Sequence, residues 1–365
     1  MQRQRFHRRT FLRTAAAGMA GAAVPVSGRA RPARRSIKAR VIGFPRDLSD
    51  SWLRFMKQIG VDDVRIGVAD VPGYTAQGYL DVDSAREVKR RLEQTGLRWG
   101  TLYLAKLDTA NLLLDRPGWQ AELDKVCRTL EAMGRVGIPV LEHSLLLSRV
   151  IRDTTGRPLP GHWVNPNGRG GAHGQSFDDE GARAVTDMPA GAVSADQMWE
   201  RITRFQERCV PVAAAARVRI ACHPDDPPVK RYWGVTQVLN TRAGLERLIN
   251  IVPSEYNGLL LCLGTMQESG ADVLELIRHF GGQKKIFDID FRSVRGTIPR
   301  YDEVFLDEGD LDMWKVVQTL VEIDYEWTIE PDHLPGVIDD RPGGPASYAW
   351  AIGYMKGLLA AAAGS

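Results

Sequence analysis

The sequence predicts an α/β protein with one (β/α)8 barrel, often called a TIM barrel. Two observations support this prediction: eight short apolar or β-branched runs recur along the chain, and amphipathic helical segments separate most of them. Strands that alternate with helices of this length form parallel sheets, and eight such units favour closure into a barrel. A doubly wound open sheet is the alternative. The length of 365 residues suits one barrel with insertions or two small domains.

The expected elements follow the chain in regular order. The expected strands occupy residues 40–44, 64–68, 99–104, 139–143, 218–223, 258–263, 286–291 and 325–330. The expected helices occupy residues 83–95, 118–135, 195–216, 243–251, 271–280 and 311–321. Together they define a single barrel domain over residues 38–362.

One segment interrupts this alternation. Residues 148–194 are rich in Gly, Pro, Asp and Arg, and they predict an irregular insertion between the fourth and fifth strands. In a barrel this insertion would cover the mouth as a lid. Arg169, which lies in its Gly-rich run, could then contact an anionic substrate group. A solvated loop without such a role is the alternative.

The charge is distributed unevenly along the chain. The formal net charge is +3, but residues 1–40 hold eleven basic residues and no acidic one. The remainder carries 37 basic and 45 acidic residues and is mildly acidic. A nucleic-acid-binding protein with a broad basic face is therefore not expected. The composition also excludes disorder, a collagen and a membrane bundle.

The N-terminus resembles a bacterial export signal. Arg8 and Arg9 precede Phe11-Leu12, and an Ala/Gly-rich apolar stretch follows over residues 14–26. Twin arginines before a short apolar region are typical of Tat signals, and the stretch is too short to span a bilayer. We expect a signal peptide over residues 1–30, cleaved near Ala23 or Ala30, and a periplasmic or secreted protein that does not bind the membrane once cleaved. A basic N-terminal arm is the alternative.

Cys127, Cys209, Cys222 and Cys262 form no CxxC pair. An even cysteine count in an exported protein suggests disulfides. A Tat substrate, however, folds in a reducing compartment, and this chain is long enough to bury its own core. We therefore expect mostly free thiols, with Cys262 as a candidate metal ligand.

Polar residues gather at the ends of the last four expected strands, where the active sites of barrels lie. His223 ends the fifth strand, Cys262 lies in the sixth, Asp290 in the seventh and Asp332 just after the eighth. Imidazole, thiolate and carboxylates together suit Mn²⁺, Fe²⁺, Co²⁺ or Zn²⁺ better than Ca²⁺ or Mg²⁺. Singly, each residue could cap a strand, fill the core, form an ion pair or begin a loop. Their occurrence on four successive strands favours a metal site.

The same region resembles a known family. His223-Pro-Asp-Asp-Pro-Pro228, the Cys262-x-Gly264 turn, Phe291-Arg292-Ser-Val-Arg295-Gly296, Pro331-Asp332-His333 and the segment from Tyr348 follow in order. This series closely resembles mannonate dehydratase, a member of the xylose-isomerase-like barrels. The resemblance is specific from about residue 215 to residue 360 and looser before that. It implies dehydration of D-mannonate to 2-dehydro-3-deoxy-D-gluconate with a divalent metal, usually Mn²⁺, with Fe²⁺ or Co²⁺ as alternatives.

The resemblance also implies roles for individual residues. It places the metal ligands on His223, Cys262, Asp290 and Asp332, and the catalytic groups on His333 and Tyr348. The family has His at position 290 and often Arg at position 330, where this chain has Asp290 and Glu330. Asp290 makes the ligand set more negative, which weakens attraction for an anionic sugar acid unless Arg292 and Arg295 offset it.

These residues suggest a sugar-acid dehydratase. Arg292, Arg295 and Arg169 are candidates for holding the carboxylate of a small-molecule sugar acid. The alternatives are a sugar isomerase or epimerase of the same barrel class and an exported binding protein without catalysis. A homo-oligomer is compatible with the sequence, which does not define the oligomeric state.

The export signal generates the first prediction. Changing Arg8 and Arg9 together to Lys should trap the precursor in the cytoplasm, because the Tat pathway reads the arginine pair. Immunoblotting of periplasmic and cytoplasmic fractions measures this. An unchanged periplasmic yield in the double variant would contradict the expected Tat signal.

Overall fold

The computed structural model describes residues 38–166 and 168–364. The expected signal peptide, residues 1–30, lies outside these described residues. Within them, no helix combines the length and hydrophobicity needed to cross a bilayer. The four cysteines are all buried free thiols, as expected.

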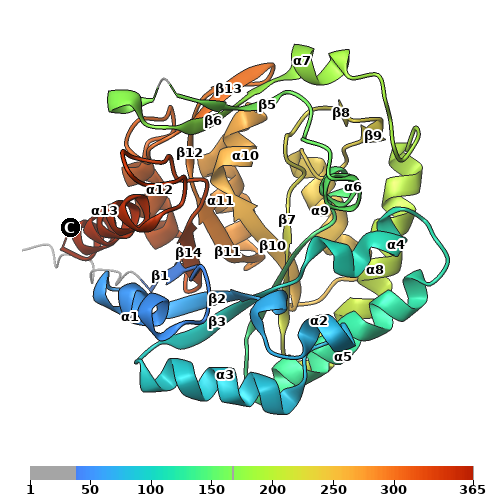
Figure 1. Ribbon diagram of the computed structural model, residues 1–365, viewed down its shortest axis with the longest axis horizontal. Coiled ribbons are helices and arrows are strands. Elements are labelled where there is room, and N and C mark those ends of the chain that lie inside the picture. The colour runs from blue at the N-terminus through green and yellow to red at the C-terminus, as the bar shows by residue number, and fades with distance from the viewer. Residues whose placement is uncertain (1–37, 167, 365) are drawn as a thin grey trace, which may run out of the picture. The chain divides into compact units, whose positions relative to one another are not determined.

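Eight parallel strands close into a barrel, which confirms the predicted fold (Figure 1). Around the barrel the order is β1, β14, β11, β10, β7, β4, β3 and β2. The bounds are β1 (Arg40–Gly43), β2 (Asp63–Gly67), β3 (Arg98–Tyr103), β4 (Val140–Ser144), β7 (Arg219–His223), β10 (Asn257–Cys262), β11 (Ile286–Phe291) and β14 (Thr328–Pro331). Each coincides with an expected strand to within a few residues.

Helices surround the barrel in Figure 1. The longer ones are α1 (Asp50–Gln58), α3 (Val82–Gln94), α5 (Trp119–Val136), α8 (Ala195–Ala216), α9 (Arg242–Ile251), α11 (Val273–Gly282), α12 (Met313–Glu322) and α13 (Pro345–Gly364). Shorter helices are α2 (Tyr74–Gln77), α4 (Ala110–Leu113), α6 (Leu147–Thr155), α7 (Asp179–Ala184) and α10 (Leu263–Glu268). The six expected helices match α3, α5, α8, α9, α11 and α12.

Local sequence signals set the ends of these helices. Ser194 begins α8 with a capping box, in which its side chain accepts from the Gln197 N–H and the Gln197 side chain accepts from the Ser194 N–H. Gly137 ends α5 with a φ of 79°, a left-handed conformation that glycine adopts without steric cost.

The insertion between the fourth and fifth barrel strands is more regular than the sequence suggested. It contains α6, α7 and two strands, β5 (His162–Asn165) and β6 (Gly174–Asp178). β6 pairs with β13 (Arg300–Val304), which forms a hairpin with β12 (Ser293–Thr297). The result is a four-stranded antiparallel sheet with the order β12-β13-β6-β5. Residues 148–194 did not predict this sheet because half of it comes from the loop after β11.

Candidate active site

The barrel places three candidate metal ligands on adjacent strands. His223 is the last residue of β7, Cys262 is the last of β10, and Asp290 is the penultimate residue of β11. The strand register sets Cys262 beside Asp290. Parallel strands bring their carboxyl ends to one end of the barrel, so the side chains converge there.

One nitrogen, one sulfur and one oxygen atom from these residues all lie within 4.8 Å of one another. His223 Nδ1 lies 2.6 Å from the carbonyl of Pro224 and must donate to it. Its Nε2 is then directed at Asp290 Oδ2, at 3.2 Å. Asp290 Oδ1 is buried and has no hydrogen-bond partner. An orphaned carboxylate oxygen beside an oriented imidazole and a thiol fits a transition-metal ion.

The electrostatic surroundings also favour positive charge at this point. Burial alone would lower the pKa of His223, but its contacts with Asp290 and Cys262 raise it well above its ordinary value. The same anionic groups would attract a divalent cation in place of that proton. The residues present therefore fit a metal ion.

Asp332, the fourth expected ligand, lies outside this three-residue cluster. Its Oδ2 is 3.8 Å from Arg292 Nε and 3.6 Å from His333 Nε2. The side chain is 26% exposed and lines the same cavity as His223 and Asp290. Its role as a ligand remains a prediction.

Arg292 lies behind the cluster and is almost fully buried. Its Nε donates to Cys262 Sγ at 3.1 Å and its Nη2 to Thr265 Oγ1 at 2.8 Å. It also forms ion pairs with three buried carboxylates, those of Glu268, Glu303 and Asp226, at 2.6, 3.3 and 3.3 Å. Arg292 therefore offsets negative charge from behind the expected ligands.

His333 follows Asp332 on the loop after β14. Its Nδ1 lies 2.6 Å from Glu303 Oε1, which orients the ring. Burial would lower the pKa of His333, but the carboxylates of Asp332 and Glu303 outweigh burial and raise the pKa to about 10. Its φ is 46°, an uncommon left-handed value for a residue other than glycine. Such strain often occurs where a side chain must be aimed.

Tyr348 lies in α13, and its hydroxyl accepts from the Phe44 backbone N–H at 2.8 Å. This bond ties α13 to the segment that follows β1. Burial raises the pKa of Tyr348 well above its ordinary value, so the phenol is a proton donor rather than a phenolate in this environment.

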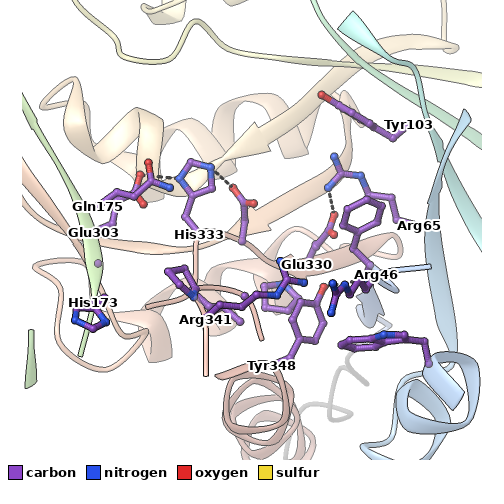
Figure 2. A pocket seen from close by; sticks show the side chains of 18 residues that line it. Arg46, Arg65, Tyr103, His173, Gln175, Glu303, Glu330, His333, Arg341 and Tyr348 are labelled. Carbon is purple, nitrogen blue, oxygen red and sulfur yellow. Dashed lines mark hydrogen bonds and ion pairs between the residues drawn. The ribbon is translucent and has the colours of Figure 1, made fainter. Parts of the chain in front are cut away.

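Two adjoining chambers occupy the carboxyl end of the barrel. The inner chamber, of about 320 Å³, is lined by strand residues that include Glu142, His223 and Asp290. The outer chamber, of about 560 Å³, is lined largely by loop residues and by Tyr348 (Figure 2). Five residues line both chambers and therefore mark their junction: Arg65, Tyr103, Gln175, Asp332 and His333.

Arg65, on β2, joins two buried carboxylates at this junction. Its Nε lies 2.6 Å from Glu142 Oε2 and its Nη1 lies 2.8 Å from Glu330 Oε2. The guanidinium also lies over the rings of Tyr103 and Phe44, at 4.3 and 5.1 Å. Arg65 therefore shares its charge between these two carboxylates and keeps a guanidinium beside Glu330.

The arginines expected to hold substrate lie elsewhere. Arg292 has its guanidinium enclosed by protein groups, and Arg295 donates to the Glu308 carbonyl from an exposed position. Arg169 pairs with Asp307 at 2.9 Å and lies over Phe305. None of the three lines either chamber. Their placement gives no support to a substrate-binding role.

Other residues of the predicted insertion do line the chambers. His173 and Gln175 come from the segment around β6, and Arg149 comes from α6. The expectation that the insertion covers the mouth therefore agrees with the structure, although Arg169 is not the residue that reaches the cavity. The sequence patterns also did not identify Arg65 and Glu142, which both line the inner chamber. Each is a charged residue within a buried barrel strand, which is the signal that could have identified them.

Solved structures with related folds support the architecture. The mannonate dehydratase from Streptococcus suis serotype2 aligns with a TM-score of 0.74 and 23% identity, over 90% of this chain and 93% of that one. An L-ribulose 3-epimerase aligns with a TM-score of 0.57 and 17% identity, over 89% and 95%. The fold and the site together define a (β/α)8 barrel with a cluster of possible metal ligands at its carboxyl end.

Sequence comparison shows which known proteins the chain resembles. Residues 188–364 match the family model for D-mannonate dehydratase (UxuA). Mannonate dehydratase 2 of Halalkalibacterium halodurans is 30% identical over 190 residues, which cover 50% of this chain and about half, 54%, of that protein. A mannonate dehydratase of Streptococcus suis is 24% identical over 325 residues, covering 83% and 87%. The C-terminal half of the chain is therefore similar to the mannonate dehydratase family.

The geometry of the cluster generates a prediction about Cys262. Replacing Cys262 with Ala should markedly lower the amount of Mn²⁺ or Co²⁺ that the purified protein binds, because one ligand atom is lost. Cys222→Ala is the matched control, since Cys222 is also a buried thiol at the end of a barrel strand. Metal analysis after dialysis measures both. Equal metal content in wild type and Cys262→Ala would contradict the ligand assignment.

Proposed function

We propose that the protein dehydrates a sugar acid, with D-mannonate as the first candidate and 2-dehydro-3-deoxy-D-gluconate as the product. One observation carries the proposal: His223 and Asp290 of the three-residue cluster line an inner chamber that is also lined by His333, and Tyr348 lines the adjoining chamber. This arrangement combines a metal site with two groups able to transfer protons.

The reaction requires two proton transfers. A proton leaves C2, which is next to the carboxylate, and the C3 hydroxyl departs as water after gaining a proton. The resulting enol tautomerises to a 2-keto acid. A divalent metal at the cluster would supply charge stabilisation for the anionic substrate as electron density builds beside the carboxylate.

His333 and Tyr348 are proposed to be the proton-transfer groups. Glu303 holds His333 Nδ1, which leaves Nε2 as the atom that can exchange a proton with substrate. The Phe44 N–H holds the Tyr348 hydroxyl from one side, so that oxygen stays at the wall of the outer chamber. Both groups are thus fixed by a second residue before substrate binds.

Arginine side chains reach both chambers, beside six carboxylates, and could hold an anionic substrate. Five arginines line the two chambers: Arg46, Arg65, Arg149, Arg152 and Arg341. An isomerase or epimerase of neutral sugars would need few cations at the barrel mouth. This difference supports a sugar-acid dehydratase over the epimerase alternative.

We further propose Mn²⁺ as the resident metal, with Fe²⁺ or Co²⁺ as alternatives, because the N, S and O donor set suits these ions. We also propose export through the Tat pathway to the periplasm or beyond, on the basis of Arg8, Arg9 and the apolar stretch after them.

Substitution of the two proposed proton-transfer residues tests the function. His333→Gln and Tyr348→Phe should each lower kcat for D-mannonate by roughly 10²- to 10⁴-fold, the range typical for loss of a general acid or base. Metal content should stay at the wild-type level. Formation of 2-keto acid with saturating Mn²⁺ is the measurement.

Matched controls lie outside the chambers. Tyr354→Phe alters another tyrosine of α13, and His279→Gln alters a histidine on α11. Both should keep wild-type kcat. Wild-type turnover by His333→Gln and Tyr348→Phe would overturn the assignment of these residues. A wild-type protein that binds Mn²⁺ but leaves D-mannonate unchanged would overturn the proposed substrate.

A further inference from the structure

The two chambers together offer more room than the inner chamber alone. Small-molecule sites typically measure about 300–1,000 Å³, and the inner chamber already reaches this range at about 320 Å³. The outer chamber, at about 560 Å³, is larger and adjoins it at Arg65, Tyr103, Gln175, Asp332 and His333. A ligand that reacts beside His333 and the His223–Cys262–Asp290 cluster can therefore extend through this junction.

Aromatic side chains line one wall of the outer chamber. Phe44 and Trp52 come from the segment after β1 and from α1, and Phe44 is 38% exposed although it is apolar. Tyr348 contributes a further ring. Flat aromatic faces bury the apolar face of a ligand ring, whereas the inner chamber is lined mainly by charged and polar groups.

Two guanidinium groups in this chamber have no partner. Arg46 and Arg341 are exposed, and among the described residues neither side chain forms a hydrogen bond or an ion pair. Figure 2 shows Arg341 extending across the cavity toward the side where Arg46 and Tyr348 lie. By contrast, Arg65 is paired with Glu142 and Glu330. Glu303, whose carboxylate also lines this chamber, forms ion pairs with His333 and Arg292.

Unpaired arginines beside aromatic rings point to a ligand with both a ring and an anionic group. Guanidinium groups bind carboxylates through two parallel hydrogen bonds, and two of them can hold one carboxylate firmly. A six-carbon acid that reaches from the His223–Cys262–Asp290 cluster to Tyr348 would fill only part of the two chambers, whose volumes are about 320 and 560 Å³, and its own carboxylate is needed beside the metal.

We propose that the outer chamber is a second binding subsite, and that the substrate is a sugar acid extended by a second sugar unit that carries a carboxylate. The sugar-acid end would react in the inner chamber, and the second unit would lie against Phe44 and Trp52 with its carboxylate on Arg46 and Arg341. This inference rests on the proposed dehydratase function for the identity of the reacting end only.

Calorimetric titration of the Mn²⁺-loaded protein tests the subsite. Three ligands are compared: D-mannonate, D-mannonate carrying a glucosyl unit at the end distant from its carboxylate, and the same acid carrying a glucuronosyl unit. Wild type should bind the glucuronosyl compound most tightly, by about tenfold or more over the glucosyl compound, because a charge-assisted pair is added.

The double variant Arg46→Ala and Arg341→Ala shows whether these arginines cause the preference. The measured quantity is the ratio of dissociation constants for the glucosyl and glucuronosyl compounds. This ratio should fall about tenfold in the double variant. Arg54→Ala is the matched control, because Arg54 is an exposed, unpaired arginine of α1 that lines neither chamber. It should leave the ratio at the wild-type value.

The other outcomes test the proposed subsite and the proposed dehydratase function separately. A wild-type protein that binds D-mannonate as tightly as either extended acid would overturn the subsite, and so would an unchanged ratio in the double variant. Arginine-dependent binding of the glucuronosyl acid without 2-keto acid formation from any ligand would support the subsite and overturn the dehydratase proposal.

Discussion

The buried guanidinium of Arg292 is the interaction on which the rest of the site depends. A charge this deeply buried is tolerated only when it is paired and fully hydrogen-bonded, and Arg292 reaches one thiol, one hydroxyl and three carboxylates. Burial would lower its pKa, but Cys262 and the surrounding carboxylates raise the pKa well above its ordinary value. Arg292 thereby fixes Cys262 at the end of β10 and Glu303 on β13. Glu303 in turn orients His333, so one side chain links the His223–Cys262–Asp290 cluster, the antiparallel sheet and one of the two proposed proton-transfer residues.

Arg65 plays a matching part at the junction of the two chambers. It forms ion pairs with both Glu142 and Glu330, two buried carboxylates of the barrel strands. Burial raises the pKa of Glu330, and Arg65 opposes that rise. The two arginines together would let a cluster that contains Asp290 accept the proposed anionic sugar acid. Positive charge is supplied from behind the ligands by Arg292 and from the opposite wall by Arg65.

Much of this architecture could be predicted from the sequence, because each barrel strand is a local apolar run and each candidate ligand ends such a run. His223, Cys262 and Asp290 converge because parallel strands share one end, which follows from topology alone. The environment of Arg292 could not be predicted, since its carboxylate partners come from separate elements that meet only in the folded chain. The antiparallel sheet was missed for the same reason: Arg300 pairs with Asp178 across a large separation in sequence. Strand patterns describe single elements, whereas these features depend on pairs of distant ones.

The central claim is that His223, Cys262 and Asp290 hold the catalytic metal at the carboxyl end of the barrel, with Arg292 behind them. Anomalous diffraction from crystals grown with Mn²⁺, measured at the manganese absorption edge, tests this claim most directly. The account predicts one strong anomalous peak within bonding distance of His223 Nε2, Cys262 Sγ and an oxygen of Asp290. A peak at another group of residues, or no peak in crystals of protein that is active with Mn²⁺, would contradict it.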